Sequence, residues 1–261
     1  MKNYNNELVS IIMNCYNGEK YLKKSIKSVL NQSHKKWELI FWDNLSNDKS
    51  RKIILEFKDK RIKYYKSKKF LKLYEARNQA IKKSKGKFVC FLDTDDWWLK
   101  DKLKDQLKIM NENKKIELIF SNFYTYYNKN KKKKLFIKYK IPNGYITQFL
   151  LNDYRIGVLT VMLKKKFFNK KKFDDRYNII GDFDYFINLS LKNYFYFMNK
   201  PTAYYRLHEK NYSLNRKEYL KELEIWLKKN SRKLIKLNYS MLNFKLFFFK
   251  LTLKKILNLG S

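Results

Sequence analysis

The first half of the chain alternates short, continuous apolar runs with segments in which apolar residues recur at helical spacing. The continuous runs, which are typical of strands covered on both faces, occupy residues 9–14, 37–42, 62–65, 87–92 and 116–120. The helical spacing covers residues 22–30, 53–57, 76–81 and 103–110. This alternation predicts an α/β fold with a Rossmann-like, mostly parallel central sheet flanked by helices.

Three polar clusters follow predicted strands directly, at residues 14–17, 43–48 and 93–96. In open α/β sheets, ligands bind beyond the carboxyl ends of the strands. We therefore expect these clusters to converge on one ligand site.

The second half of the chain has a mixed pattern. Residues 123–127 and 135–141 flank the basic run 128–134, which predicts a hairpin with a solvated tip. Three further elements are predicted: a strand at Gly157–Leu163, a helix at Phe183–Leu191 and extended structure at Tyr194–Leu207. From residue 216 onward the apolar period is helical, and the segment 242–259 mixes large apolar residues with Lys.

The composition is that of a folded and strongly basic protein. Of 261 residues, 44% are hydrophobic and 18% are aromatic, which is too apolar for a disordered chain. Lys and Arg number 60 and Asp and Glu 24, so the formal net charge is +36. The lysines are spread along the whole chain, so two interpretations stay open: compositional drift at tolerant surface positions, or attraction to an anionic partner.

Glycine and cysteine usage narrows the class further. The chain has 6 Gly and neither a GxGxxG nor a GxxxxGK[ST] motif, which argues against a glycine-rich phosphate loop. Cys15 and Cys90 lie in strand-like runs, so we expect buried thiols in a reducing compartment. Every apolar run is shorter than the ~18 residues of a spanning helix, and we expect a cytoplasmic protein.

The strongest local signal is the sequence Asp-Thr-Asp-Asp at residues 93–96, between a predicted strand and two tryptophans. Carboxylates this close repel one another, so a divalent cation is the natural compensating charge. Oxygen ligands favour Mg²⁺ or Mn²⁺, which take further ligands from water and substrate phosphates. The alternative is an acidic start to the following helix, where the helix dipole favours carboxylates.

Four segments occur in the order and spacing of a known family: VSIIMNCYNGEKYLKKSIKSVLNQS, ELIFWDNLSND, EARNQAI and GKFVCFLDTDDWW. On these motifs the chain resembles the family 2 glycosyltransferases, which are inverting enzymes of the GT-A fold that use nucleotide-diphosphate sugars. The resemblance is clear from Val9 to about Lys104, and it resumes in IIGDFDYFINLSLKN and YYRLHEKNYS.

The resemblance implies a nucleotide-sugar site at the ends of the first two strands. Asn14, Tyr16 and Asn17 match residues that border the base, and an aromatic ring such as Tyr16 suits stacking. The family's paired acids correspond here to Asp43 and Asn44. An amide both donates and accepts, so Asn44 is a candidate partner for a pyrimidine edge, and we expect a UDP-sugar donor.

The resemblance also implies contacts to the diphosphate and to a metal ion. Arg77 and Asp93 match nucleotide-binding residues, and the guanidinium fork of Arg77 fits phosphate oxygens; the alternative for Arg77 is an ordinary exposed helix residue. The implied ligands of Mg²⁺ or Mn²⁺ are Asp95, Asp96 and His208. Arg206 is expected near the diphosphate, and a structural role for His208 is the alternative.

Asp182, in the segment GDFD, matches the general base of the family. It would take the proton from the acceptor hydroxyl while that hydroxyl attacks the anomeric carbon opposite the diphosphate, which gives inversion. The alternative is that Asp182 only caps a helix N-terminus. We expect Asp184 to be structural.

We expect three parts: a nucleotide-sugar half at 1–122, an acceptor half at 123–215 and a basic amphipathic helical extension at 216–261. The extension either lies on an anionic membrane surface or packs back onto the domain. The resemblance implies a glycan or lipid-linked acceptor in lipopolysaccharide or capsule synthesis, at the inner face of the cytoplasmic membrane.

Two other classes compete with this interpretation. A basic nucleic-acid-binding protein would use Lys and stacked aromatic rings, but the carboxylates at residues 93–96 would repel a phosphate backbone, so we expect no nucleic-acid partner. A sugar-phosphate nucleotidyltransferase would have a related sheet but would begin with a glycine-rich phosphate loop. The sequence lacks that loop.

Overall fold

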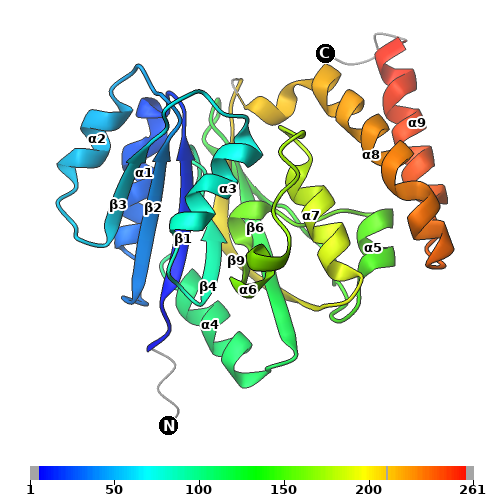
Figure 1. Cartoon of the computed structure of the whole chain (residues 1–261), viewed down its shortest axis with the longest axis horizontal. Coiled ribbons are helices and arrows are strands. Elements are labelled where there is room, and N and C mark those ends of the chain that lie inside the picture. Colours follow the sequence, from blue (N-terminus) through cyan, green and yellow to red (C-terminus); the bar gives the residue numbers. More distant parts are fainter. Residues whose placement is uncertain (1–5, 210, 257–261) are drawn as a thin grey trace.

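One mixed sheet organises the protein. The computed structural model describes residues 6–209 and 211–256, and within them nine strands form a sheet in the order β3-β2-β1-β4-β8-β6-β9-β5, with β7 paired to β6. Figure 1 shows helices on both sides of this sheet and two long C-terminal helices at the edge of the molecule farthest from β3.

The parallel part of the sheet comes from the first half of the chain. β1 (Val9–Cys15) lies between β2 (Trp37–Asp43) and β4 (Phe88–Phe91), and β3 (Ile62–Lys66) pairs with β2; all of these pairings are parallel. β1, β2 and β4 are buried along almost their whole length. Burial on both faces explains why their sequences are apolar at consecutive positions, and these predicted strands are confirmed.

Each face of this sheet has its own hydrophobic core. α1 (Glu19–Leu30), α2 (Ser50–Glu56) and α4 (Lys102–Glu112) cover one face, and α3 (Leu73–Lys83) covers the other. Ile11 and Ile12 belong to different cores because successive side chains of a strand point to opposite faces. Both cysteines are buried free thiols, as predicted.

Beyond β4 the sheet becomes mixed, in agreement with the mixed pattern of the second half of the sequence. β8 (Met162–Lys164) is inserted antiparallel between β4 and β6 (Ile116–Tyr127). β6 then pairs in parallel with β9 (Tyr194–Leu207), which carries β5 (Trp97–Trp98) antiparallel at the edge. A strand of two residues is too short to produce a periodic pattern, so β5 leaves no clear signal in the sequence.

Three predicted boundaries differ from the structure. β6 is one strand from Ile116 to Tyr127, where the sequence predicted separate segments at 116–120 and 123–127. Strand β7, Lys132–Leu135, pairs back onto β6, and residues 136–141 form no strand. The segment predicted as a strand at 157–163 begins instead with a 3₁₀ turn, Val158–Thr160, before β8.

The remaining helices lie together at one side of the sheet. α7 (Gly181–Ser190) matches the predicted helix, and α8 (Arg216–Lys236) packs on it, where the Trp226 Nε1–H donates to Asp184 Oδ1 at 3.0 Å. Asp184 is therefore structural, as expected. Two short helices, α5 (Thr147–Asn152) and α6 (Lys166–Lys170), were not predicted.

The last described helix, α9 (Leu242–Ile256), has a packed side and an exposed side. Phe244 is buried, with its ring stacked 5.4 Å from that of Phe183. The exposed apolar residues of α9 are Leu242, Leu246, Phe247, Phe249 and Leu253. Packing back onto the domain thus accounts for one side only; residues 257–259 of the predicted segment lie outside the described residues.

A helix able to cross a membrane needs both length and uniform apolar character. Within residues 6–209 and 211–256, no helix combines the two.

Candidate active site

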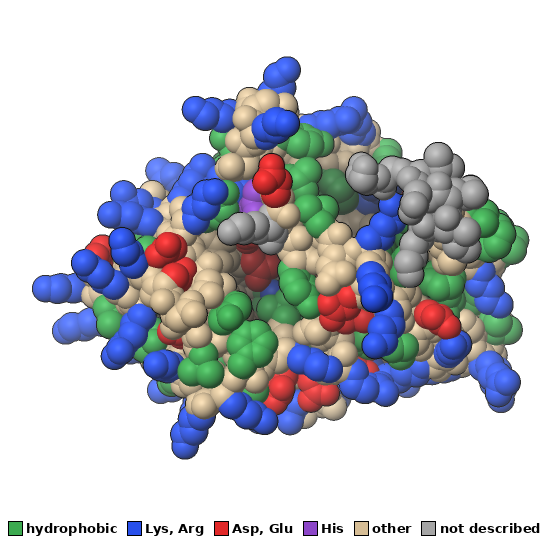
Figure 2. Space-filling view, turned by 90° about the horizontal axis from the view of Figure 1, so that it is seen from above, with side chains coloured by type: hydrophobic (Ala, Val, Ile, Leu, Met, Phe, Trp, Pro, Cys, Tyr) green, Lys and Arg blue, Asp and Glu red, His purple; other side chains and the backbone are tan. Residues whose placement is uncertain are grey.

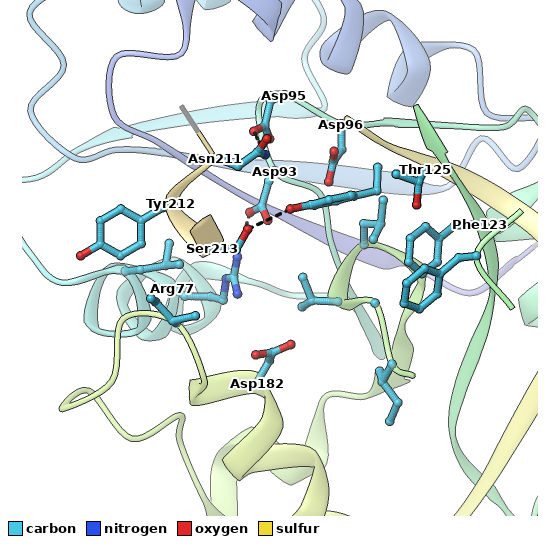
Figure 3. Close-up of a pocket in the computed structure, with 18 of the residues that line it drawn as sticks. Arg77, Asp93, Asp95, Asp96, Phe123, Thr125, Asp182, Asn211, Tyr212 and Ser213 are labelled. Carbon is cyan, nitrogen blue, oxygen red and sulfur yellow. Dashed lines mark hydrogen bonds and ion pairs between the residues drawn. The ribbon is translucent and has the colours of Figure 1, made fainter. Parts of the chain in front are cut away.

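A cavity of about 910 Å³ opens beyond the carboxyl end of β4. Five of the predicted site residues line it, namely Arg77, Asp93, Asp95, Asp96 and Asp182. In Figure 3, Asp182 on α7 lies across the cavity from the acidic residues, with Arg77 to one side between them. Figure 2 shows acidic side chains deep in a hollow of this face, with Lys and Arg side chains around its periphery.

The acidic segment 93–96 does not begin a helix. It is followed by β5, and α4 starts only at Lys102 with Asp101 as its N-cap residue. The alternative interpretation of these acids as a helix start is therefore wrong. They form a loop at a strand end, where a ligand can reach them.

Arg77 is a buried part of the cavity wall. Its side chain is 2% exposed, and its Nη2 lies 2.8 Å from Asp93 Oδ1. The alternative of an ordinary exposed helix residue is wrong. A buried guanidinium needs a charge partner, and Asp93 supplies it, so α3 and the acidic loop are fixed to each other.

Asp95 is linked to the segment that follows β9. His208 Nε2 lies 3.0 Å from Asp95 Oδ2, and Asn211 Nδ2 lies 3.5 Å from the same oxygen. Burial and the nearby Asp93 charge raise the pKa of Asp95, so this carboxylate gains from a cation beside it. Two residues from distant parts of the sequence, Asp95 and His208, are thereby brought together.

Few side chains near the acidic loop could serve as ligands for the predicted metal ion. Among the residues the structure describes, no three His, Cys, Asp or Glu side chains converge as a metal site. Asp95 and His208 nevertheless fit an ion such as Mg²⁺ or Mn²⁺, because such ions keep several water and phosphate ligands and need only one or two from the protein.

Asp96 and Arg206 support the acidic loop from behind. Asp96 is 2% exposed, and its Oδ1 accepts the backbone N–H of Arg206 at 2.8 Å. The Arg206 Nε–H donates to the carbonyl of Asp95 at 2.8 Å, and its guanidinium lies 4.2 Å from the centre of the Tyr21 ring. Arg206 does not line the main cavity, so we revise its expected diphosphate contact to a role in positioning Asp95 and Asp96.

Asp182 lies in the first turn of α7, whose N-cap residue is Ile180. The interpretation of Asp182 as a helix cap is therefore wrong. Its Oδ1 accepts the hydroxyl of Tyr74 at 2.8 Å. Burial raises the pKa of Asp182, whereas the Tyr74 hydroxyl and the Arg77 charge lower it, and the net direction is upward.

The start of α7 is fixed by a glutamate from α8. Glu222 is buried and accepts the backbone N–H groups of Asn178, Ile179 and Ile180 at 2.6, 2.9 and 3.0 Å. These bonds satisfy donors that would otherwise be unpaired beside a helix start. Glu222 thereby sets the direction in which α7 presents Asp182.

The predicted base-binding residues lie at the ends of β1 and β2. Tyr16 is 54% exposed, and its ring centre lies 4.8 Å from that of Phe70, which is 59% exposed. Both polar atoms of the Asn14 amide are buried without a hydrogen-bond partner among the residues that the structure describes. Asn17 has φ 53° and accepts the backbone N–H of Asn47 at 2.9 Å, so it shapes the turn.

The second polar cluster is largely used within the protein. Asp43 accepts the Tyr64 hydroxyl at 2.7 Å and the Ser46 N–H at 2.8 Å. The Asn44 amide donates to the Leu71 carbonyl at 2.8 Å and accepts the Leu71 N–H at 3.1 Å. Because both ends of this buried amide are engaged, we revise Asn44 from a base contact to a residue that positions the loop carrying Phe70.

Three residues at the site were not identified from the sequence. Tyr74 lies next to the recognised segment EARNQAI, so its position was a usable signal. Phe70, in the lysine-rich stretch KSKKFLK, has no local signal beyond being aromatic. Glu222 belongs to an ordinary charged helix pattern, KELEIW, and only the fold reveals its partners.

Comparisons with known proteins agree with this geometry. The family model described as "Glycosyl transferase family 2" matches residues 10–186. The chain is 37% identical over 184 residues to the Escherichia coli UDP-Glc:alpha-D-GlcNAc-diphosphoundecaprenol beta-1,3-glucosyltransferase WfgD, covering 70% of this chain and 69% of WfgD. It is 41% identical over 107 residues to the putative teichuronic acid biosynthesis glycosyltransferase TuaG of Bacillus subtilis, covering 40% of this chain and 42% of TuaG.

Solved structures share the fold at low sequence identity. TarS residues 1–349 of S. aureus, in complex with UDP-GlcNAc, superposes with a TM-score of 0.64 at 16% identity, covering 83% of this chain and 64% of that one. The mannosyltransferase PcManGT of Pyrobaculum calidifontis, in complex with GDP-Man and Mn²⁺, gives a TM-score of 0.62 at 13% identity, covering 84% and 64%. The predicted GT-A fold is confirmed. The residues matched by the family model include most of the sheet, and the cavity lies at the end of β4 within them. The chain therefore belongs to glycosyltransferase family 2 and is an enzyme.

Proposed function

We propose that this enzyme transfers a sugar, with inversion, from a UDP-sugar to a hydroxyl of a lipid-linked or glycan acceptor in cell-surface polysaccharide synthesis. The observation that carries the proposal is that one cavity is lined by Asp182 on one side and by Arg77, Asp93 and Asp95 on the other. One side suits proton transfer and the other suits a diphosphate. The names of WfgD and of the TarS complex support a UDP-sugar.

Asp182 acts as the general base. Its carboxylate takes the proton of the acceptor hydroxyl while the hydroxyl oxygen attacks the anomeric carbon from the face opposite the diphosphate. Such assistance contributes about 10² to 10⁴ in rate. The Tyr74 hydroxyl orients the carboxylate through its hydrogen bond of 2.8 Å, and burial keeps the pKa of Asp182 raised, which strengthens it as a base.

The opposite side of the cavity holds the donor diphosphate. Arg77 orients Asp93 through their ion pair and contributes positive charge beside the phosphates. Asp95 and His208 would hold a divalent cation, Mg²⁺ or Mn²⁺. When bound, that ion would neutralise charge on the departing diphosphate. The Mn²⁺ in the PcManGT complex supports this choice of ion.

The nucleotide base lies against Tyr16 and Phe70. Both rings are more than half exposed at the end of β1 and in the loop after β3, where they offer faces for stacking. Asn44 holds the Phe70 loop through Leu71. The Asn14 amide lies at the end of β1. Its nitrogen and oxygen have no hydrogen-bond partner among the described residues, so they offer a donor and an acceptor to the base.

The proposal is tested by measuring the thermal unfolding midpoint with nucleotide-diphosphate sugars, in the presence and absence of Mn²⁺. A ligand that binds the folded state alone raises the midpoint. We expect UDP-sugars to raise it more with Mn²⁺ than without, and GDP-sugars to have a smaller effect. Equal midpoints with every nucleotide sugar would contradict the proposal.

A further inference from the structure

A second cavity adjoins the active-site cavity on the side of α9. It has a volume of about 380 Å³ and lies among α5, α7, α8 and α9. Asp182 and Ile179 line both cavities. The proposed general base therefore lies between the two cavities.

The lining of the second cavity has an apolar part and a polar part. The apolar part includes Leu150, Leu151, Ile180, Phe183, Leu223 and Phe247, and the polar part includes Asn152, Asp153 and Arg155. Tyr154 is the residue that joins this lining to the catalytic centre. Its hydroxyl is buried, and burial together with the Asp182 charge raises the pKa of Tyr154 well above its usual value.

The cavity leads outward to the exposed side of α9. Phe247 stands at its rim with 44% of its surface exposed, and Leu246 and Phe249 beside it are 46% and 58% exposed. The sequence of α9, LNFKLFFFKLTLKKI, contains Lys but no Asp or Glu. The second cavity thus has Asp182 and Phe247 of α9 in its lining, and Figure 1 shows α9 at the edge of the molecule.

We propose that the second cavity binds the hydrocarbon chain of a lipid-linked acceptor. The inference rests on the proposed function, because it takes Asp182 as the residue that meets the acceptor hydroxyl. The leucine, isoleucine and phenylalanine side chains of the lining favour a hydrocarbon chain, because each methylene gains about 0.8 kcal/mol on burial. The exposed side of α9 then lies in the membrane interface, with its lysines near anionic headgroups.

The test measures binding of farnesyl phosphate by calorimetry, with the full chain and at concentrations below micelle formation. We expect saturable binding that inorganic phosphate does not reproduce and that UDP does not displace. The variant Phe247→Ser, altered at the cavity rim, should bind about tenfold more weakly, which corresponds to about 1.4 kcal/mol. The matched control Phe249→Ser, on the same helix but outside the cavity lining, should bind like the unaltered protein.

The outcomes separate the inference from the function on which it rests. UDP-sugar binding without saturable farnesyl phosphate binding would overturn the inference alone. So would displacement of farnesyl phosphate by UDP, or equal weakening by both phenylalanine variants. Absence of any UDP-sugar binding would contradict the proposed function and, with it, the acceptor role of this cavity. Thermal unfolding of each variant establishes that it is folded.

Discussion

At the scale of single residues, the proposed chemistry depends on how neighbouring groups shift the pKa of Asp182. Burial raises its pKa, and the Tyr74 hydroxyl and Arg77 charge oppose that effect. A base must be deprotonated to work, so groups that lower its pKa extend activity to lower pH, while burial increases its strength as a base. The balance is set by residues from α3 and α7, which the fold brings together.

Tyr74→Phe tests this balance. Removing the hydroxyl removes a hydrogen bond that lowers the pKa of Asp182, so the pKa should rise further and the acidic limb of the kcat/KM profile should move to higher pH. One hydrogen bond of about 1 kcal/mol corresponds to roughly a fivefold loss in kcat. Tyr177→Phe is the control, because the buried Tyr177 hydroxyl has no hydrogen-bond partner within residues 6–209 and 211–256. An acidic limb that moves to lower pH in Tyr74→Phe would contradict this account.

Asn44→Ala tests whether Asn44 positions a loop or reads the base. The change leaves the N–H and carbonyl of Leu71 unpaired, and we expect unfolding free energy to fall by about 2 kcal/mol. UDP should bind more weakly, but the ratio of UDP to GDP affinity should stay unchanged. Phe70→Ala is the comparison: it should weaken UDP binding without lowering stability. A changed ratio of UDP to GDP affinity in Asn44→Ala would instead support a direct contact between Asn44 and the base.

At the scale of elements, the site depends on how α7 is joined to α8. Glu222 accepts three backbone N–H groups at the start of α7. Its partners are about forty residues away in the sequence, so the interaction ties the C-terminal helices to the catalytic centre. The predicted extension from residue 216 is therefore part of the machinery that positions Asp182.

Glu222→Ala should lower both stability and turnover. Three donors lose their acceptor, and we expect unfolding free energy to fall by about 2 to 4 kcal/mol, with a fall in kcat that exceeds any change in UDP affinity. Glu224→Ala is the matched control on the same helix, because Glu224 is exposed and forms an ion pair with Lys228 four residues on. Chemical denaturation measures the change in stability, and steady-state kinetics measures the change in kcat. Equal effects of the two variants would contradict the role of Glu222.

The strands and loops differ in whether they could be predicted from the sequence. β1, β2 and β4 were predictable because strands buried on both faces are apolar at every position. The acidic loop after β4 was predictable because three carboxylates at a strand end have no use in a core. The antiparallel place of β8 between β4 and β6 was not predictable, since it depends on long-range pairing. The partners of Asn44 and Glu222 were hidden for the same reason.

At the scale of the whole molecule, charge and apolar surface have different distributions. The formal charge of +36 is spread along the chain, while exposed large apolar residues gather on α9. A diffuse positive charge attracts an anionic surface from any side, whereas the group of exposed apolar residues on α9 adds contacts that would favour one orientation. In that orientation the cavity beside Asp182 opens toward the lipid.

Vesicle binding tests this orientation. The double variant Leu246→Ser, Leu253→Ser should lower affinity for anionic vesicles by about tenfold through lost apolar burial. Leu55→Ser is the control, because Leu55 is 54% exposed on α2, on the opposite side of the molecule (Figure 1). Raising the ionic strength to about 1 M, where screening acts within about 3 Å, should weaken binding for every variant. Equal binding of the double variant and the control in cosedimentation would contradict the orientation.

The most direct measurement of the central claim compares turnover and donor binding in Asp182→Asn. The amide keeps the shape of the side chain but cannot accept the proton of the acceptor hydroxyl. We predict that kcat falls by at least about 10², while the dissociation constant of UDP measured by calorimetry stays within about twofold. Turnover close to that of the unaltered enzyme would contradict the assignment of Asp182 as the base and, with it, the division of the cavity into a proton-transfer side and a diphosphate side.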